Sequence, residues 1–586
     1  MNIEHYTPSG FALDIFKDRY AIHENETFSD ACRRVANHIA SAEFGKKRDE
    51  YAARFYDILV TNRFSCGGRI WRGSGRPRGQ LLNCFAIPCE DSREGWGDLL
   101  RSVLIISGMG GGVGVNFSHV RPRGTPIRGT GGESTGSVSI MKMVNAMCEE
   151  LREGGGRRSA LLFCLNYDHP DIPEFLSVKL DEKQLNNANI SVCIDDQFIK
   201  LLDAEEDVIF RWKGEERGRM PARELWNKIV TNAWESGDPG LLNIGLANNM
   251  NTAYYAGEVV TTNPCGEVWL MSYDCCCLGA INLASHIVGG KMDWDLLEET
   301  VAISVRFLDD VIDQNHYPLP IIRETCQNHR RIGLGVMGLH DMLLQMRFKY
   351  DTDGARSMVE EVMDFIKKRA YDTSIMIAVE KGPFHSFDPE KHIQSGFAKK
   401  HLTKSLRRRI KEHGIRNCAL LTIAPTGTTS IVAGCSSGIE PIFQCVYKRS
   451  FNKHANQHSP ERESSSEIVI HPLVKKFLQE GKSVDHFQTA HEIAPYDHLA
   501  MQAICQRHID NSISKTINLP NNYDLEELSD VMREFIDEVK GITLYRDGSK
   551  GESPMTPVEI EEAKKYLSSI ESTSSVNDCP KGSCEI

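Results

Sequence analysis

The stretch NPCGE, residues 263–267, presents a cysteine at a tight turn. Pro264 favours an extended conformation at Asn263, and Gly266 has no side chain that would hinder a close approach to Cys265. The pentapeptide therefore predicts a thiol displayed between the amide of Asn263 and the carboxylate of Glu267. On these five residues alone, a structural cysteine in an ordinary turn remains the alternative interpretation.

A second cysteine-rich stretch, YDCCCLGAINL, follows at residues 273–283. Because successive side chains of a strand point to opposite faces, we expect Cys276 on one face and Cys275 and Cys277 on the other. A structural zinc site favours cysteine pairs separated by two to four residues, which this spacing does not provide. We therefore expect no metal site here.

A third cysteine motif, CPKGSC, occupies residues 579–584 at the end of a polar segment. A reducible pair formed by Cys579 and Cys584 on such a tether suits thiol–disulfide exchange with another site. Half of a zinc knuckle, or a chance pair, is the alternative interpretation.

The loop APTGTTS, residues 424–430, offers several hydroxyls around an accessible backbone. It would bind an anion if it opens a helix, but it lacks the lysine and the spacing of a Walker A loop. The glycine run at 108–114 (GMGGGVG) lacks the strand, spacing and acidic residue of a dinucleotide-binding fingerprint.

Composition narrows the function classes. The chain has 586 residues and a net charge of −12, which argues against direct binding of nucleic-acid polymers. Its 18 cysteines make up a fraction of the 586 residues far below the ~8% that is typical of a disulfide scaffold. Residues 1–10 show no signal-peptide pattern, and no apolar stretch approaches the ~18 residues of a membrane span. We expect a cytoplasmic protein with reduced thiols and no membrane contact.

The chain divides into three regions. Residues 1–78 are predicted to be helical, with a helix over 30–46 that Thr27 or Ser29 caps and that places Phe44 on its apolar side. The glycine- and arginine-rich stretch 67–79 is predicted to be a loop. Residues 79–548 alternate strands with helices, which indicates an α/β fold. The predicted strands lie within 81–92, 160–176, 189–202, 420–443 and 541–548, and a helix covers 294–313.

The third region, residues 549–586, is predicted to be a flexible tail. Within it, the capping box at 556–559 predicts a helix to about Ile570, followed by a linker at 571–578 that ends in the cysteine pair. The polar stretch 448–466 is predicted to be a mobile loop.

Taken in order, these motifs resemble the catalytic subunit of ribonucleotide reductase. The ordered set is NPCGE, CxLGAINL ending at Leu283, PTGTTS with GIEP at 438–441, TLYRDGS at 543–549 and the C-terminal cysteine pair. The resemblance runs from about residue 79 to the C-terminus. It implies a ten-stranded α/β barrel with a finger loop through its centre, preceded by the helical region.

The resemblance assigns roles to the active-site residues. Cys265 would be a transient thiyl radical that abstracts the 3′ hydrogen of the ribose, Glu267 would take the 3′-hydroxyl proton, and Asn263 would hydrogen-bond the substrate hydroxyls. Cys84 and Cys276 would supply the reducing electrons.

The resemblance also assigns the supporting sites. Cys579 and Cys584 would reduce the disulfide formed in turnover and be recharged by thioredoxin or glutaredoxin. The substrate phosphates would lie on one loop made of Pro425, Thr426, Gly427, Thr428, Thr429 and Ser430.

The family's effector site implies a homodimer regulated by dNTP or ATP. Asp91 would contact the effector nucleotide and Arg121 its phosphate, and the loop 181–189 would relay effector identity to substrate choice. Because the barrel motifs begin by Cys84, we expect no additional N-terminal ATP-binding domain.

The radical source distinguishes two classes of the family. A single tyrosine, Tyr545, precedes Arg546-Asp547-Gly548, where the class with a separate radical subunit carries two. This difference favours the adenosylcobalamin-dependent class acting on ribonucleoside diphosphates. The alternatives are a catalytic subunit served by a metal-containing partner, a non-catalytic nucleotide-binding regulatory barrel, and a zinc-dependent structural protein.

Overall fold

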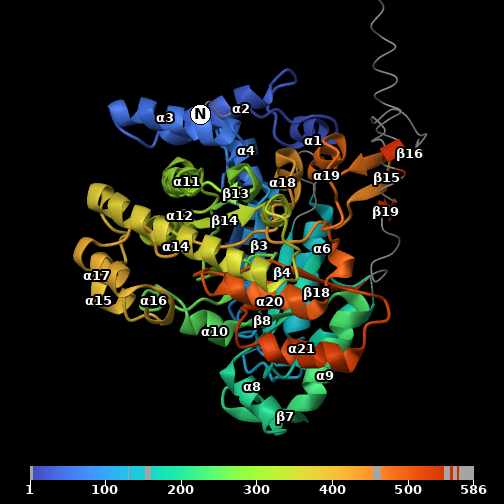
Figure 1. Ribbon diagram of the computed structural model, residues 1–586. Coiled ribbons are helices and arrows are strands. Elements are labelled where there is room, and N and C mark those ends of the chain that lie inside the picture. The colour runs from blue at the N-terminus through green and yellow to red at the C-terminus, as the bar shows by residue number, and fades with distance from the viewer. Residues whose placement is uncertain are drawn as a thin grey trace, which may run out of the picture.

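The computed structural model describes residues 4–129, 131–151, 160–181, 183–452, 464–546, 555–558, 562 and 564–565. Helices gather at one end of the molecule and sheets with covering helices form the rest (Figure 1). The N-terminal helices are α1 (Phe11–Arg19), α2 (Phe28–Ala40), α3 (Lys46–Val60) and α4 (Gly68–Gly73).

Helix α2 begins at a capping box. The Thr27 side chain accepts a hydrogen bond from the Asp30 backbone, and the Asp30 carboxylate accepts one from the Thr27 backbone. The predicted cap Thr27 and the predicted helix are confirmed from residue 30 to residue 40, but its expected continuation over 41–45 is wrong. Helix α2 ends at Ala40, and Phe44 lies in the turn before α3 with 89% of its surface exposed.

Two sheets form the scaffold of the chain. The larger has the order β17-β18-β8-β5-β4-β3-β2, and its neighbours are parallel except for β18 and β8. Its strands are β2 (Cys84–Ala86), β3 (Gly112–Asn116), β4 (Leu161–Asn166), β5 (Ala188–Ile194), β8 (Gly240–Asn243), β17 (Thr516–Leu519) and β18 (Gly541–Arg546). The smaller has the order β1-β11-β14 and contains β1 (Phe64–Cys66), β11 (Leu278–Asn282) and β14 (Gly333–Met337). Four of the five predicted strand regions contain a strand, whereas the strand expected within 420–443 is wrong, because Leu421 and Ile423 form only isolated bridges there.

Isolated bridges connect the edges of these sheets. Phe85 in β2 pairs with Cys275, just before β11, and Ile423 pairs with Ile513, just before β17. Leu421, close to Ile423, pairs with Leu334 in β14. The α/β expectation is confirmed in this arrangement, and the larger sheet contains strands from both halves of the chain.

Helices cover the outside of the sheets. The helix predicted over 294–313 is confirmed as α11 (Trp294–Gln314). The long helices α11 and α14 pack against each other beneath the N-terminal helices (Figure 1). The remaining helices are α5 (Arg93–Gly108), α6 (Ser137–Glu150), α7 (Ile172–Ser177), α8 (Asp196–Asp203), α9 (Ala222–Ser236), α10 (Ile244–Asn249), α12 (Pro320–His329), α13 (Leu339–Gln345), α14 (Asp353–Lys381), α15 (Pro389–His392), α16 (Gly396–His401), α17 (Lys404–His413), α18 (Gly427–Ala433), α19 (Pro472–Gln479), α20 (Pro495–Gln506) and α21 (Leu525–Phe535).

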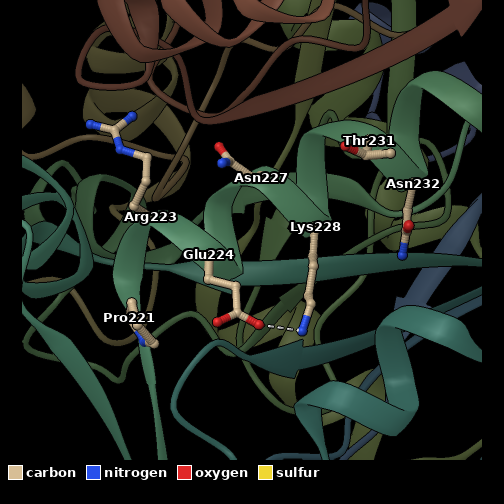
Figure 2. A pocket seen from close by; sticks show the side chains of 7 residues that line it. All are labelled: Pro221, Arg223, Glu224, Asn227, Lys228, Thr231 and Asn232. Carbon is tan, nitrogen blue, oxygen red and sulfur yellow. Dashed lines mark hydrogen bonds and ion pairs between the residues drawn. The ribbon is translucent and has the colours of Figure 1, made fainter.

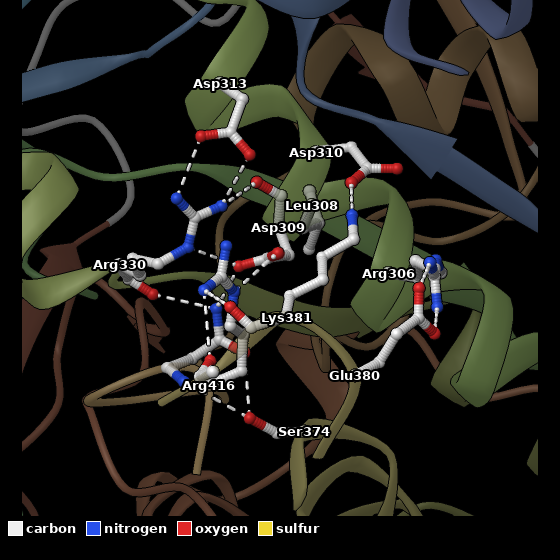
Figure 3. Close-up of polar contacts among 12 residues, drawn as sticks. Arg306, Leu308, Asp309, Asp310, Asp313, Arg330, Ser374, Glu380, Lys381 and Arg416 are labelled. Atoms are coloured by element: carbon white, nitrogen blue, oxygen red, sulfur yellow. Dashed lines mark hydrogen bonds and ion pairs between the residues drawn. The ribbon is translucent and has the colours of Figure 1, made fainter. Parts of the chain in front are cut away.

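A buried ionic network ties α11 and α14 to neighbouring segments (Figure 3). Asp309 accepts hydrogen bonds from Arg330 at 2.8 Å and from Arg416 at 3.1 Å. Lys381 contacts Asp310 at 2.7 Å. Because each buried carboxylate has a cationic or polar partner, α11 can be buried despite its acidic side chains.

Three sequence expectations are corrected by the structure. Residues 68–73 of the predicted loop 67–79 form α4. The predicted mobile loop 448–466 contributes both ends to a hairpin of β15 (Val446–Asn452) and β16 (Ser464–Ile470). Thr556 and Pro557, predicted to open a helix, instead belong to β19 (Met555–Pro557), which pairs with β15. Glu562, Lys564 and Lys565 are helical, and the linker lies outside the described residues.

The remaining strands form small antiparallel pairs. They are β6 (Asp207–Trp212) with β7 (Glu215–Pro221), β9 (Thr261–Thr262) with β10 (Trp269–Leu270), and β12 (Ile287–Val288) with β13 (Lys291–Met292). None of the helices in the described ranges combines the length and the apolar character that crossing a membrane requires.

Candidate active site

The NPCGE motif forms the tip of the β9–β10 hairpin. The Asn263 side-chain oxygen accepts from the Val268 backbone N–H at 3.0 Å, and the Gly266 N–H donates to the Asn263 carbonyl at 2.9 Å. Gly266 has a φ of 80°, which its missing side chain makes accessible. Cys265 is exposed, whereas Asn263 and Glu267 are buried on either side of it.

The hairpin is held by strand β3 and by the segment just before β17. A Cβ on Gly114 of β3 would lie 1.8 Å from the Thr262 carbonyl oxygen, so only glycine allows this approach. At the other end of the motif, the Glu267 carbonyl accepts from the Ser512 N–H at 3.0 Å, and Asn511 accepts from the Trp269 N–H at 2.6 Å. These contacts fix the position of the thiol relative to the larger sheet.

Burial changes the chemistry of Glu267. Desolvation raises the pKa of its carboxyl to about 7, and the neighbouring Asn263 amide opposes the rise only in part. Within the described residues, Glu267 Oε2 and Asn263 Nδ2 are buried without a hydrogen-bond partner of good geometry. Buried polar atoms of this kind suit a bound polar ligand, because an unpaired polar group otherwise costs free energy.

Cys84 and Cys276 face each other across neighbouring backbone segments. The Cys84 N–H donates to Cys276 Sγ at 3.1 Å, and the Cys276 N–H donates to the Cys84 carbonyl at 3.0 Å. Burial, with a contribution from Cys84, raises the pKa of the Cys276 thiol well above its ordinary value, and Glu267 raises it further. The thiol pair and the hairpin carboxyl therefore share one site.

The alternation expected for the cysteine run is confirmed. Cys275 points away from Cys276 and lies 2.8 Å from Cys326, sulfur to sulfur, while the Cys277 thiol lies 3.5 Å from the Leu308 carbonyl. Burial raises the pKa of both Cys275 and Cys277 well above the ordinary thiol value, which makes their reactive thiolate forms rare.

The loop APTGTTS opens a helix, as its anion-binding interpretation required. Helix α18 begins at Gly427, after Thr426 in a left-handed conformation. Pro425 and the residues to Thr429 line the same cavity as Cys265. Ser430 is not among the described residues that line it, because its buried hydroxyl is bonded to Ser437 at 2.7 Å.

One cavity of about 520 Å³ brings these groups together. Asn263, Cys265, Glu267 and Cys84 line it together with residues 425–429. Tyr20 and Arg69 are among its further lining residues, and no sequence motif indicated them. The Tyr20 hydroxyl is bonded to Thr428, which lies 408 positions away in the sequence, so no local pattern signals the contact.

Another hollow, of about 510 Å³, lies along α9 (Figure 2). Its lining carries an ion pair between Glu224 and Lys228 at 2.7 Å, but no cysteine. The chemistry expected from the sequence motifs is therefore located in the cavity at the hairpin tip.

Asp91 and Arg121 lie together away from that cavity. Arg121 Nε lies 2.8 Å from Asp91 Oδ1, and the Arg121 backbone N–H donates to the same carboxylate at 3.1 Å. The Asp91 carboxylate raises the pKa of the Arg121 guanidinium. Cys579 and Cys584 lie outside the described residues.

Comparisons with known proteins cover most of the chain. A family model described as "Ribonucleotide reductase, barrel domain" matches residues 82–545, and one described as "Ribonucleotide reductase, all-alpha domain" matches residues 6–79. The chain is 36% identical to a vitamin B12-dependent ribonucleoside-diphosphate reductase of Thermoplasma acidophilum, over 92% of this chain and 72% of that protein.

Two further relatives differ in how much of this chain they match. A vitamin B12-dependent ribonucleoside-diphosphate reductase of Mycobacterium tuberculosis is 33% identical over 98% of this chain and 84% of its own. A ribonucleoside-diphosphate reductase subunit alpha of Chlamydia trachomatis is 28% identical over 74% of this chain and 47% of its own.

Proposed function

Because the chain belongs to the ribonucleotide reductase family, we propose that the cavity at the hairpin tip converts ribonucleoside diphosphates into 2′-deoxyribonucleotides. The reaction is of the vitamin B12-dependent type that the names of its relatives give. The observation that carries the assignment is the set of Asn263, Cys265 and Glu267 at one hairpin tip, in one cavity with Cys84.

Each group has a defined task. A thiyl radical on Cys265 takes the 3′ hydrogen atom, Glu267 accepts the 3′-hydroxyl proton, and the Asn263 amide orients the substrate hydroxyls. The 2′-hydroxyl leaves as water while Cys84 and Cys276 give up two electrons and two protons to form a disulfide. Cys265 then returns its hydrogen to C3′ and regains the radical, and Glu267 returns its proton to the 3′-oxygen, so atoms and electrons balance.

Adenosylcobalamin, when bound, supplies the radical that is passed to Cys265. The space beside exposed Cys265 has room for the reactive end of the cofactor, because Gly110, Gly111 and Ala160 line it without bulky side chains. These residues would border that end of the cofactor.

The test is cytidine diphosphate reduction by the purified chain with a small dithiol, with and without adenosylcobalamin. We expect deoxycytidine diphosphate only with the cofactor. Formation of product without cobalamin, and only after a metal-containing protein subunit is added, would instead support the class that uses a separate radical subunit.

The C-terminal cysteines are proposed to recycle the thiol pair. Cys579 and Cys584 would reduce the Cys84–Cys276 disulfide by exchange and be recharged by thioredoxin or glutaredoxin. Changing both to serine should stop turnover with thioredoxin and spare it with a small dithiol, whereas equal loss with both reductants would reject this role.

A regulatory site is proposed at Asp91 and Arg121, in a homodimer that binds dNTP or ATP effectors. The support is their shared position and the loop 181–189, whose last residue, Asn189, donates to the Pro264 carbonyl at 3.2 Å. This bond would connect the loop to the hairpin tip. Unchanged substrate preference in an Asp91→Ala, Arg121→Ala variant, measured with each effector, would reject the site.

The strands of the two sheets are proposed to close into a ten-stranded barrel around the hairpin as a finger loop. The bridges Phe85–Cys275 and Ile423–Ile513 at the sheet edges support closure. Amide hydrogen exchange at these two edges tests it, since open edges would exchange rapidly.

A further inference from the structure

We propose that the N-terminal helical region completes the substrate site, with Tyr20 and Arg69 binding the outer phosphate of the nucleoside diphosphate. The inference rests on the proposed function and adds residues that no motif assigns. Both line the 520 Å³ cavity that contains Cys265 and the loop 425–429. The two family models meet near residue 80, so Tyr20 and Arg69 belong to the all-alpha domain rather than to the barrel domain.

Tyr20 presents a hydroxyl at the proposed phosphate loop. It follows α1, only 4% of its surface is exposed, and its hydroxyl is bonded to the hydroxyl of Thr428. The Arg34 guanidinium donates to the Tyr20 carbonyl at 3.2 Å, which fixes the backbone of this residue. Because one of the two hydroxyls donates its proton to the other, the pair offers one free O–H donor to a phosphate oxygen at the cavity wall.

Gly68 makes room for the Tyr20 ring. A Cβ on Gly68 would lie 3.2 Å from Tyr20 Cε1 and 3.3 Å from its hydroxyl oxygen. Because a side chain at position 68 would push the ring away from Thr428, glycine at this position and tyrosine at position 20 are complementary. The close packing indicates that the hydroxyl is held in place before a ligand arrives.

Positive charge gathers around the same opening. Arg19, Arg69 and Arg72 line the cavity, while Glu267, whose pKa is about 7, is the one carboxyl among its described lining residues. Arg69 and Arg72 also line an adjoining hollow of about 190 Å³ that includes Arg76 and Arg78 and no acidic residue. In a chain with net charge −12, this local concentration of arginines favours the binding of an anion that carries more than one charge.

The geometry assigns different roles to the two parts of the site. The loop 425–429 lines the cavity that also contains Cys265, so it suits the phosphate attached to the ribose. Arg69 lies between the cavity and the adjoining hollow, so it suits the terminal phosphate. The chain would therefore select diphosphates over monophosphates through Arg69, because a guanidinium binds phosphate by charge-assisted hydrogen bonds.

The first test compares binding of cytidine diphosphate and cytidine monophosphate by calorimetry. Arg69→Gln should weaken diphosphate binding roughly tenfold or more and leave monophosphate binding nearly unchanged, with partial rescue by Arg69→Lys. Arg76→Gln is the matched control, because exposed Arg76 lines only the adjoining hollow. An equal loss for both nucleotides in Arg69→Gln, or an equal loss in Arg76→Gln, would overturn the assignment.

The second test removes single hydroxyls. Tyr20→Phe keeps the ring against Gly68, and it should raise KM for cytidine diphosphate about tenfold with little change in kcat. Tyr6→Phe is the matched control: the Tyr6 hydroxyl also contacts α18, donating to the Val432 carbonyl at 2.8 Å, but Tyr6 is not among the described cavity-lining residues. Equal effects of the two variants on KM would mean that Tyr20 only supports the helix.

The outcomes separate this inference from the proposed function. If the unmodified chain reduces cytidine diphosphate and both Tyr20→Phe and Arg69→Gln match it in KM and affinity, the inference is wrong while the function stands. If it binds the diphosphate through these residues but forms no deoxynucleotide, the proposed function is wrong while the phosphate site stands.

Discussion

At the residue scale, the buried carboxyl of Glu267 links protein structure to reaction rate. With a pKa of about 7, the carboxyl is largely protonated below neutral pH and cannot accept the proton of the 3′-hydroxyl. The base form grows as the pH rises through this value. We therefore expect kcat/KM to rise with pH up to about 7 and then level off, measured with cytidine diphosphate at saturating cofactor.

Glu267→Gln provides the control for this pH profile. It keeps the shape of the side chain and removes the base, so it should be inactive at every pH. A profile of the unmodified chain that stays flat between about pH 5.5 and about pH 8.5 would contradict the assignment of Glu267 as the base.

The three adjacent cysteines make a second residue-scale prediction. Cys276 contacts Cys84, whereas Cys277 lies against the Leu308 carbonyl on the opposite face. Cys276→Ala should lower turnover by a factor on the order of a thousand or more, because no disulfide can form with Cys84. Cys277→Ala, the matched control, should retain turnover, and comparable losses in the two variants would contradict the proposed division of roles.

Sequence patterns were sufficient to predict the residues of the hairpin tip and the strand faces on which the adjacent cysteines lie. The alternation of side chains along a strand assigned Cys276 and its neighbours to opposite faces, and a local turn motif predicted exposed Cys265. Tyr20 and Arg69 could not be predicted, because their place in the cavity depends on packing between segments hundreds of residues apart.

At the element scale, the position of the β9–β10 hairpin depends on Gly114. Gly114→Ala should displace the hairpin and cost about 1–3 kcal/mol or more, because the added Cβ would overlap the Thr262 carbonyl oxygen. Turnover should fall with stability, measured by dithiol-supported reduction and by denaturant unfolding. Gly108→Ala is the control, since no heavy atom lies within 4 Å of its Cβ position. Full activity in Gly114→Ala would contradict this account of the hairpin.

Local signals also misassigned some elements, for a physical reason. The capping box at 556–559 is a genuine local preference, but Thr556 and Pro557 pair with the β15 strand instead. Strand pairing depends on partners far away in the sequence, and such tertiary contacts override local propensity. The same reason explains why the ends of the predicted loop 448–466 form a hairpin.

At the scale of the whole molecule, an ionic cluster joins the N-terminal region to the helices of the larger part. Arg306 of α11 lies 2.6 Å from Glu380 (Figure 3) and 2.7 Å from Glu43, and its guanidinium stacks 4.1 Å from the centre of the Tyr51 ring. Burial raises the pKa of Glu43, but hydrogen bonds from Arg306 and Lys381 outweigh it and hold the pKa at about 2. The carboxylate therefore stays charged and depends on these cations.

Removing one partner tests this connection. Arg306→Met should destabilise the protein by about 3–5 kcal/mol, because it leaves Glu43 buried with fewer partners. Lys228→Met removes half of the exposed Glu224–Lys228 pair in Figure 2 and should cost less than about 1 kcal/mol. Denaturant midpoints measure both changes, and equal shifts would contradict a stabilising role for the cluster.

The central claim is that Cys265 takes the 3′ hydrogen of a ribonucleotide. The most direct measurement is reduction of cytidine diphosphate deuterated at C3′, by the unmodified chain and by Cys265→Ser, with adenosylcobalamin and a small dithiol. We predict slower product formation from the deuterated substrate with the unmodified chain and no deoxycytidine diphosphate from Cys265→Ser. Product formation by Cys265→Ser at a comparable rate would contradict the claim.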